Sequence, residues 1–280
     1  MASAPPEIFV RARRRARRDR AAARFADHAF LVDAIGDELL DRLDDVTRHF
    51  DHALDLGCHD GRLGERLKLR GMRVTSADAG FRFASAAGGV QCDEDRLPFA
   101  DASFDLVVSA GVLDQVSDIP GALALIRRVL KPDGLFLAGF LGAGSLPVLR
   151  DTMMAADMAA DRGVGPRLHP QIDVRAAGDL LHRAGFALPV ADSRPLAVRY
   201  GDPLRLIHDL RGMAATNLLV DGGRAPLTRI GLAAAAARFA EGADLDGRRA
   251  ETFELMVMTG WAPDPASASR PPPSEPRRIF

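Results

Sequence analysis

The sequence predicts an α/β fold with a seven-stranded, mostly parallel sheet. Short apolar runs alternate with helix-like segments from residue 53 onward, a turn with two glycines follows the first of these runs, and two further apolar runs come late in the chain. Alternating strands and helices form parallel sheets, because right-handed crossovers bring successive strands side by side. The last apolar run is expected to pair with the one before it as an antiparallel edge.

The individual elements follow from hydrophobic periodicity and from turn residues. Residues 7–50 are expected to be helical, because Leu31, Ile35 and Leu39 recur at helical spacing. Parallel strands are expected at Ala53–Leu56, Arg73–Ala77, Val90–Cys92, Leu106–Ser109 and Leu135–Phe140, with helices at 62–70 and 120–130 and a turn at Lys131–Gly134. Helical inserts at 146–163, 174–186, 202–219 and 227–240 accompany the last two strands, at 188–200 and 252–262.

Length and composition indicate one globular domain. The chain has 280 residues, of which 47% are apolar and 27% charged, so it can bury a core. Its net charge of −1 gives no reason to expect a nucleic-acid partner, and no apolar run is long enough to span a membrane. The domain is expected at 7–262, with N-terminal helices at 7–50, the core at 51–142, inserts and last strands at 143–262, and disordered tails at 1–6 and 263–280.

The cysteines and the basic residues bear on the cellular compartment. Cys58 and Cys92 are too few for a disulfide scaffold and lack metal-ligand spacing, so they are interpreted as reduced thiols and no metal is expected. The Arg- and Ala-rich N-terminus resembles an organellar transit peptide. However, Lys68 and Lys131 are the only lysines in an otherwise arginine-based set, a bias typical of a GC-rich genome. The sequence therefore favours the bacterial cytoplasm over the mitochondrial matrix.

The stretch "DLGCHDG", from Asp55 to Gly61, is the expected ligand site. Ligands of doubly wound sheets bind beyond the carboxyl ends of the strands. A dinucleotide needs G-x-G-x-x-G, so that backbone amides reach its pyrophosphate. Here His59 and Arg62 stand where that pattern has glycine, and the carboxylate of Asp55 would repel a pyrophosphate. A nicotinamide enzyme is therefore disfavoured, although it remains an alternative hypothesis.

Acidic residues at the ends of three successive strands favour S-adenosylmethionine, which carries no phosphate. Asp55 suits the cationic methionyl part, and the turn at Gly57 offers free amides for its carboxylate. Asp78, 21 positions beyond Gly57, suits the ribose hydroxyls. Asp93 suits the adenine amino group, with Leu97–Phe99 as an apolar wall. Any one of these acids could be a solvated carboxylate at a strand end, but the three in this order are more specific than the glycines.

The motifs "LDLGCHDG", "SAD", "CDEDRLPFADASFDLVVS" and "IRRVLKPDGLFLAGF" resemble the core of the class I S-adenosylmethionine-dependent methyltransferases, a Rossmann-like fold, over about residues 50–142. The departure is His59, where that family usually has its middle glycine. Its β-carbon is expected to demand a negative φ or to narrow the approach to the methionyl group, and its ring could hydrogen-bond the ligand carboxylate. The resemblance implies cofactor contacts from Asp55, Gly57, Cys58, His59, Gly61, Asp78, Ala79, Asp93, Glu94, Ser109 and Ala110, with Gly111 at the exit of the fourth strand.

A second resemblance extends over nearly the whole chain outside the tails. The segments "IFVRARRRARRDRAAARFADHAFL", "DVRAAGDLLHRAGFALPVADS", "DPLRLIHDLRGMAATN" and "TFELMVMTGWAP" are similar to bacterial relatives of the methyltransferase-fold complex I assembly factor of mitochondria, and more distantly to the biotin-synthesis carboxyl methyltransferase. The first of these implies arginine hydroxylation on a respiratory-complex subunit, hence a protein partner. Because fold does not fix function, methyl transfer is the leading hypothesis, and hydroxylation and a non-catalytic assembly chaperone are alternatives.

The acceptor side is expected just after the fourth strand, in "SAGVLDQVSDIPG". Asp114 and Gln115 are the candidate catalytic residues, although relatives of this branch tend to carry His-Trp there. Asp114 would act as a general base or bind a cation; otherwise it is a solvated loop acid or a helix cap. Candidate substrate contacts are His169, in an insert that could form a lid, and Arg175, Arg211 and Asn217, for which salt bridges or helix caps are an equally good explanation.

The tract "RARRRARRDR", Arg11–Arg20, contains seven arginines and one aspartate. It is expected to be a solvated helix face, or to dock an acidic partner or a membrane surface with an affinity that falls as salt rises. No aromatic residues interleave with the arginines to stack on bases, so a nucleic-acid role is disfavoured.

Overall fold

The computed structural model describes residues 7–161, 165–221 and 226–264. The tails expected at 1–6 and 263–280 lie outside the described residues, except for 263 and 264. The strands are β1 (His52–Leu56), β2 (Arg73–Asp78), β3 (Val90–Gln91), β4 (Phe104–Ala110), β5 (Leu130–Leu141), β6 (Ala187–Tyr200) and β7 (Arg249–Trp261). The helices are α1 (Arg11–Ala21), α2 (Phe30–Asp44), α3 (Arg62–Leu69), α4 (Phe81–Ala86), α5 (Ile119–Val129), α6 (Pro147–Ala159), α7 (Val174–Arg183), α8 (Pro203–Gly212) and α9 (Arg229–Ala240), with short 3₁₀ helices η1 (Phe25–His28) and η2 (Leu113–Gln115).

The strands form one seven-stranded sheet in the order β3-β2-β1-β4-β5-β7-β6. Strands β1 to β5 are parallel, and β7 pairs antiparallel with both β5 and β6. The predicted mostly parallel sheet and the antiparallel pairing of the last two strands are therefore confirmed. Strand β7 lies one position inside the edge, which β6 forms. The chain order reverses between β1 and β4, and this switch point is where such sheets bind ligands.

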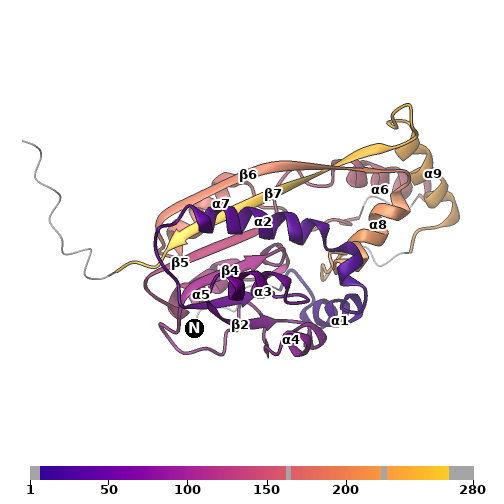
Figure 1. Ribbon diagram of the computed structural model, residues 1–280. Coiled ribbons are helices and arrows are strands. Elements are labelled where there is room, and N and C mark those ends of the chain that lie inside the picture. Colours follow the sequence, from indigo (N-terminus) through magenta and orange to yellow (C-terminus); the bar gives the residue numbers. More distant parts are fainter. Residues whose placement is uncertain (1–6, 162–164, 222–225, 265–280) are drawn as a thin grey trace, which may run out of the picture.

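Alternating side chains of the central strands pack into two apolar layers. Leu106 and Val108 of β4 join Ile35 of α2 and other residues on one face, whereas Val107 joins Ile126 of α5 on the other. This period of two is the pattern of a strand that is buried on both faces. The sheet is therefore covered by α2 and α3 on one side and by α5 and α7 on the other (Figure 1).

Several predicted elements differ from the structure, and three of these differences are informative. Strand β5 begins at Leu130, and the residues expected to form a turn, Lys131–Gly134, bulge out within it, because Phe104 pairs with Leu130 and Leu106 already pairs with Leu135. The short helix α4 was not expected from periodicity, since six residues are too few to show it. Helix α8 ends at Gly212 instead of continuing through residue 219.

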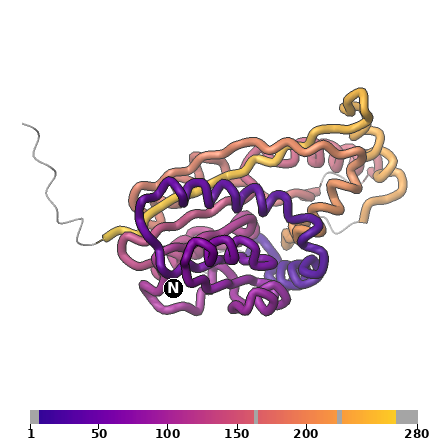
Figure 2. The backbone as a smooth tube through the Cα atoms, in the orientation of Figure 1, coloured from indigo at the N-terminus to yellow at the C-terminus, as the bar shows by residue number. Residues whose placement is uncertain are grey.

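The long strands β6 and β7 extend beyond the parallel core, and α6, α8 and α9 pack around this extension (Figure 1). The N-terminal segment lies between the two parts: α1 contacts α4 of the core and α8 of the extension, as the indigo trace in Figure 2 shows. The start of this segment is fixed by backbone hydrogen bonds from Val10 N to Leu218 O and from Val220 N to Ile8 O. Among the described residues, no helix is both long and apolar enough to cross a membrane.

Candidate functional site

The glycine turn after β1 is held tightly against β2. The amides of Gly57 and Cys58 both donate to the carbonyl of Ala77, at 2.7 and 3.0 Å, and Gly61 N donates to Cys58 O. Gly57 adopts a φ of 81°, and a β-carbon there would lie 2.4 Å from a methyl group of Val112, so only glycine fits. The expectation of free amides in this turn is therefore wrong at these positions, because the turn uses them to attach itself to the neighbouring strand.

His59 occupies the turn in a glycine-like conformation. Its φ is 49°, so the first of the two expected alternatives, a negative φ, is excluded; the strain of such a residue is on the order of 1–2 kcal/mol. The buried ring stacks on Phe25, with 4.6 Å between centroids, and its Nε2 lies 2.9 Å from the carbonyl oxygen of Ala110. With Nε2–H donating there, Nδ1 is left to accept from Arg18 at 3.3 Å. Burial and the charge of Arg18 lower the pKa of His59 to about 3, so the ring is neutral.

Asp78, the expected ribose ligand, is fully buried and has an internal partner. Arg18 Nε donates to Asp78 Oδ1 at 2.7 Å, and Arg18 Nη2 donates to Oδ2. The amides of His59 and Gly80 also donate to this carboxylate, at 3.0 and 2.7 Å. Burial alone would raise the pKa of Asp78, but the charge and hydrogen bonds of Arg18 outweigh it and hold that pKa below its usual range.

The same helix pairs with the other expected cofactor acids. Arg14 makes a two-pronged contact with Glu94 at 2.6 and 2.8 Å, and Arg11 makes one with Asp95 at the same distances. Arg15 pairs with Asp93. Residues at i, i+3, i+4 and i+7 share one side of a helix. We call this side the paired face of α1; it consists of Arg11, Arg14, Arg15 and Arg18.

Asp55 lies beneath these pairs without an arginine of its own. Its carboxylate is buried, and neither oxygen has a hydrogen-bond partner of ordinary geometry among the described residues. Burial and the negative charge of Asp78 raise the pKa of Asp55 to about 7. A buried carboxylate in this state is a polar group that a ligand's donor could satisfy.

The remaining residues expected to contact the cofactor lie in the turn after β1 and at the ends of the neighbouring strands. Ala79 and Ala110 are buried, and Ser109 Oγ is buried with no hydrogen-bond partner in the described part of the chain. Cys58 and Cys92 are buried free thiols, and burial raises the pKa of both, that of Cys92 to about 12. Thiols in this state are poor nucleophiles.

The carboxylates and the hydroxyl group gathered here are of the kinds that could bind the polar groups of S-adenosylmethionine. Asp78 and Asp93 can accept from hydroxyl and amino groups, and Asp55 and Ser109 have buried oxygens without a hydrogen-bond partner of ordinary geometry among the described residues. In the conformation described here, however, guanidinium groups of α1 satisfy Asp78 and Asp93, and the ring of His59 fills the turn. A cofactor that bound through Asp78 and Asp93 would therefore compete with these arginines for the two carboxylates.

An apolar cavity of about 540 Å³ adjoins this edge of the sheet. Asp114 of η2 lines it, together with leucine side chains such as Leu141 and Leu149. Burial raises the pKa of Asp114 to about 7, although the charges of Arg14 and Arg18 oppose the shift. Gln115 is buried and lines a much smaller cavity beside Arg14, of about 10 Å³. Of the two catalytic candidates, only Asp114 therefore faces a space that could hold a substrate.

The candidate substrate residues divide into two groups. His169, Arg211 and Asn217 line the apolar cavity, whereas Arg175 is exposed in the first turn of α7 and is not among the lining residues. His169 Nε2 accepts from Leu218 N at 2.9 Å, and burial lowers its pKa to about 4. It therefore anchors the loop after α8 as a neutral ring. Asn217 also supports the loop, because its side chain bonds Pro166 O and Leu219 N.

Sequence reasoning missed the arginines of α1 as part of the site. The tract was expected to be a solvated face or a docking surface, yet Arg14 and Arg18 are among the most buried polar residues. The available signal was the helical spacing of four arginines and the run Asp93–Asp95, which offers three carboxylates together. Sequence alone does not reveal that these two segments meet.

Comparisons with known proteins point to the same fold and the same class of site as the structure. Residues 54–138 match a family model described as "Methyltransferase domain". The arginine-hydroxylase NDUFAF5 of zebrafish mitochondria is 32% identical over 93% of this chain and 84% of its own length. The malonyl-[acyl-carrier protein] O-methyltransferase of Methylovorus sp. is 32% identical over 91% of this chain and 90% of its own length. A solved structure of a putative methyltransferase from Bacillus halodurans, 14% identical, covers 81% of this chain and 99% of its own with a TM-score of 0.56, which shows the shared fold. The chain therefore belongs to the methyltransferase-domain family that includes the NDUFAF5 arginine-hydroxylases and the malonyl-[acyl-carrier protein] O-methyltransferases.

Proposed function

We propose that the chain is an S-adenosylmethionine-dependent methyltransferase with its acceptor in the apolar cavity beside Asp114. The observation that carries the proposal is the convergence of carboxylates from three neighbouring strands at one edge of the sheet. The charge of Asp78 raises the pKa of Asp55, and Asp78, Asp93 and Glu94 all act on the single guanidinium of Arg14. Isolated strand-end carboxylates in solvent would not influence one another in this way.

Each acid has a role that its position supports. Asp78 would accept from the ribose hydroxyls, Asp93 from the adenine amino group, and Asp55 would lie toward the cationic methionyl part. When bound, the cofactor supplies a methyl group on a sulfonium, and the transfer depends on alignment more than on acid–base groups. The chain's own contribution is then to orient the two reactants and to exclude water.

Asp114 is the group best placed to take a proton from an acceptor. Its pKa of about 7 leaves a large share of the carboxylate ionised near neutral pH, which suits a general base. The oxygen Oδ1 has no hydrogen-bond partner among the described residues, so it is available to an acceptor. Gln115 has no such access and is proposed only to support the loop.

The test is calorimetric titration of S-adenosylmethionine into the full chain. We expect binding to the unmodified protein, at least a tenfold loss in Asp93→Asn and Asp78→Asn, and no change in Asp179→Asn, an exposed acid of α7. Thermal unfolding of each variant shows whether it is folded. Absence of binding to the unmodified protein would overturn the proposal and favour a non-catalytic role in assembling a partner protein.

Arginine hydroxylation is the second candidate, and the match to NDUFAF5 over 93% of the chain favours it. This reading makes the partner a protein with an exposed arginine. Mass spectrometry of candidate partners separates the two activities, because methylation adds one CH₂ unit and hydroxylation adds one oxygen atom. The arginine bias of the sequence supports a bacterial cytoplasmic location, whereas relatives named as mitochondrial support the matrix.

A further inference from the structure

The opposite side of α1 carries arginines that no carboxylate of the described residues neutralises. Arg13, Arg17 and Arg20 continue past the helix end to Arg24 at spacings of four, three and four residues, and we call them the unpaired face. Arg13 and Arg17 donate only to the backbone carbonyls of Leu219 and Asn217. Across the residues that the structure describes, no carboxylate forms an ion pair with any of the four.

This face borders a second cavity, of about 450 Å³, which we call the cationic cavity. Its lining includes Arg17, Arg20 and Arg24 from the N-terminal segment, and Arg211 from α8. Arg24 and Arg211 are exposed, and their guanidinium groups make no hydrogen bond or ion pair with another described residue. Burial and the like charges of Arg13, Arg20 and Arg211 lower the pKa of Arg17. The positive charges of these arginines therefore lie close together, and no carboxylate of the described residues pairs with them.

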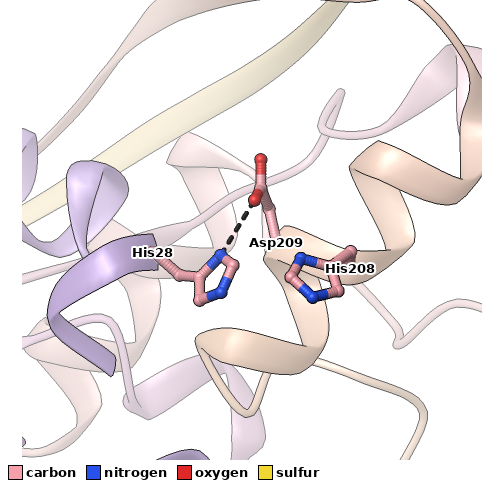
Figure 3. A group of neighbouring side chains, drawn as sticks. All are labelled: His28, His208 and Asp209. Carbon is pink, nitrogen blue, oxygen red and sulfur yellow. Dashed lines mark hydrogen bonds and ion pairs between the residues drawn. The ribbon is translucent and has the colours of Figure 1, made fainter. Parts of the chain in front are cut away.

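His28 and His208 line the same cavity, and Asp209 lines a neighbouring cavity that these two histidines also border. His28 of η1 and His208 and Asp209 of α8 bring ligand atoms within 4.8 Å of one another, a grouping that could suit a metal ion (Figure 3). Asp209 Oδ1 is already bonded to His28 Nδ1 at 2.9 Å. Four arginines next to a single carboxylate would repel a divalent cation, so the electrostatics of the cavity favour an anion.

A phosphoryl group is the anion that fits best. A guanidinium group binds two oxygens of a phosphate or a carboxylate through two parallel hydrogen bonds. A carboxylate has only two oxygens, so one arginine uses both of them. A phosphate monoester carries up to two charges and three acceptor oxygens, so it can engage several arginines together. The convergence of Arg17, Arg24 and Arg211 on one space is therefore typical of phosphate recognition.

The rest of the ligand is indicated by the neighbouring space. The cationic cavity and the apolar cavity share Arg17, Arg211 and Thr216 as lining residues, so the two adjoin. The apolar cavity continues to Asp114 at the cofactor edge. A ligand that fills both would place its charged end among the arginines and its apolar part toward Asp114.

We infer that the chain binds an organic phosphate with an apolar stem, with its phosphoryl group in the cationic cavity and its stem in the apolar cavity. As an assignment of substrate class to the cavity beside Asp114, this inference rests on the proposed function. As a binding site, it rests on the unpaired arginines and on the two adjoining cavities, and it does not depend on the proposed function.

The experiment is calorimetric titration of hexyl phosphate into the full chain without S-adenosylmethionine. Inorganic phosphate lacks the stem and hexanol lacks the charge, and we expect each to bind at least tenfold more weakly. The double variant Arg24→Gln/Arg211→Gln is expected to lose at least tenfold in affinity for hexyl phosphate. The matched control Arg175→Gln/Arg183→Gln removes two exposed arginines from α7 and should change the affinity less than twofold.

Several results would overturn the inference. These are no binding of hexyl phosphate, an equal loss in the control variant, or binding of Zn²⁺ alone at the His28 cluster. Sedimentation with vesicles that contain phosphatidic acid, without binding of hexyl phosphate, would also overturn it in favour of a membrane surface. Binding of S-adenosylmethionine is measured in a separate titration. Failure of hexyl phosphate to bind would therefore not count against the proposed function, and failure of S-adenosylmethionine to bind would not count against the phosphate site.

Discussion

The two faces of α1 carry the same residue type and meet opposite environments. On the paired face, Arg11, Arg14, Arg15 and Arg18 each contact a carboxylate that ends β2 or follows β3. On the unpaired face, Arg13, Arg17, Arg20 and Arg24 contact no described carboxylate. Four side chains of each kind on one short segment show that composition does not determine what an arginine does; the segment that folds against it does.

The two faces also differ in how their arginines affect the free energy of unfolding. A buried guanidinium and carboxylate give little net stability, yet removal of one partner costs roughly 3–5 kcal/mol because the other stays buried and charged. Exposed like charges repel weakly and the repulsion is screened by salt. The paired face is therefore expected to be sensitive to mutation and the unpaired face tolerant, unless a ligand is present.

The largest expected effect follows from Arg18→Met, which breaks the most buried pair of the paired face. Asp78 would keep only the amides of His59 and Gly80, so the free energy of unfolding should fall by about 3–5 kcal/mol. The same change frees the carboxylate for the ribose hydroxyls, and we expect the dissociation constant of S-adenosylmethionine to fall at least tenfold. Urea unfolding and calorimetry measure the two quantities.

The control is Arg20→Met on the unpaired face, which should alter neither quantity appreciably. If Arg18→Met does not fold, Arg15→Met tests the same competition more mildly, because it removes the most exposed of the arginines that pair with Asp93 and leaves Arg11 in place. A stability loss without tighter cofactor binding would mean that the arginines of the paired face do not compete with the cofactor.

Much of the sheet follows from the sequence because its signal is local. The runs at Ala53–Leu56 and Leu106–Ser109 are short, apolar and bounded by turns, and both are strands in the structure. The acids Asp55, Asp78 and Asp93 were predicted to meet because strand ends of a parallel sheet share an edge. The pairing of Arg18 with Asp78 joins residues 60 positions apart, and no local pattern encodes such a contact.

The next effect concerns Asp55, the acid that α1 leaves without a guanidinium. Its folded pKa of about 7 lies above the ordinary value of 3.8, so its contribution to stability is complete below about pH 4 and is lost as the pH rises through 7. We expect Asp55→Asn to unfold with a free energy roughly 2–4 kcal/mol higher than the unmodified chain at pH 8, and similar to it near pH 4. A constant difference in urea unfolding from pH 4 to 8 would contradict this.

A smaller effect of opposite sign is expected for His59, which lies between Arg18 and Ala110. Its folded pKa of about 3 is below the ordinary value of 6.5, so its contribution is complete above pH 6.5 and is lost as the pH falls toward 3. The unmodified chain should lose about 2 kcal/mol from this group between pH 7 and 5. Asn tolerates a positive φ, so His59→Asn should keep the turn and lack this loss. Parallel slopes for both proteins would show that other groups carry the acid sensitivity.

The smallest expected effect tests the unpaired face directly. Arg20→Gln removes one of the charges that lower the pKa of Arg17, without removing an ion pair among the described residues. The free energy of unfolding should therefore rise by a few tenths of a kcal/mol at low salt, within the range of about ±0.5 kcal/mol of ordinary surface substitutions.

The salt dependence decides whether repulsion is the cause. The Debye length shortens from about 30 Å at 0.01 M salt to about 3 Å at 1 M, so the gain from Arg20→Gln should disappear at high salt. The reference is Arg183→Gln on α7, which removes an exposed arginine that forms no ion pair with another described residue and should show no such dependence. A loss of stability in Arg20→Gln, at any salt concentration, would mean that the unpaired face has a partner within the chain. The contrast between the two faces of α1 would then be one of degree, and the cationic cavity would need no external anion.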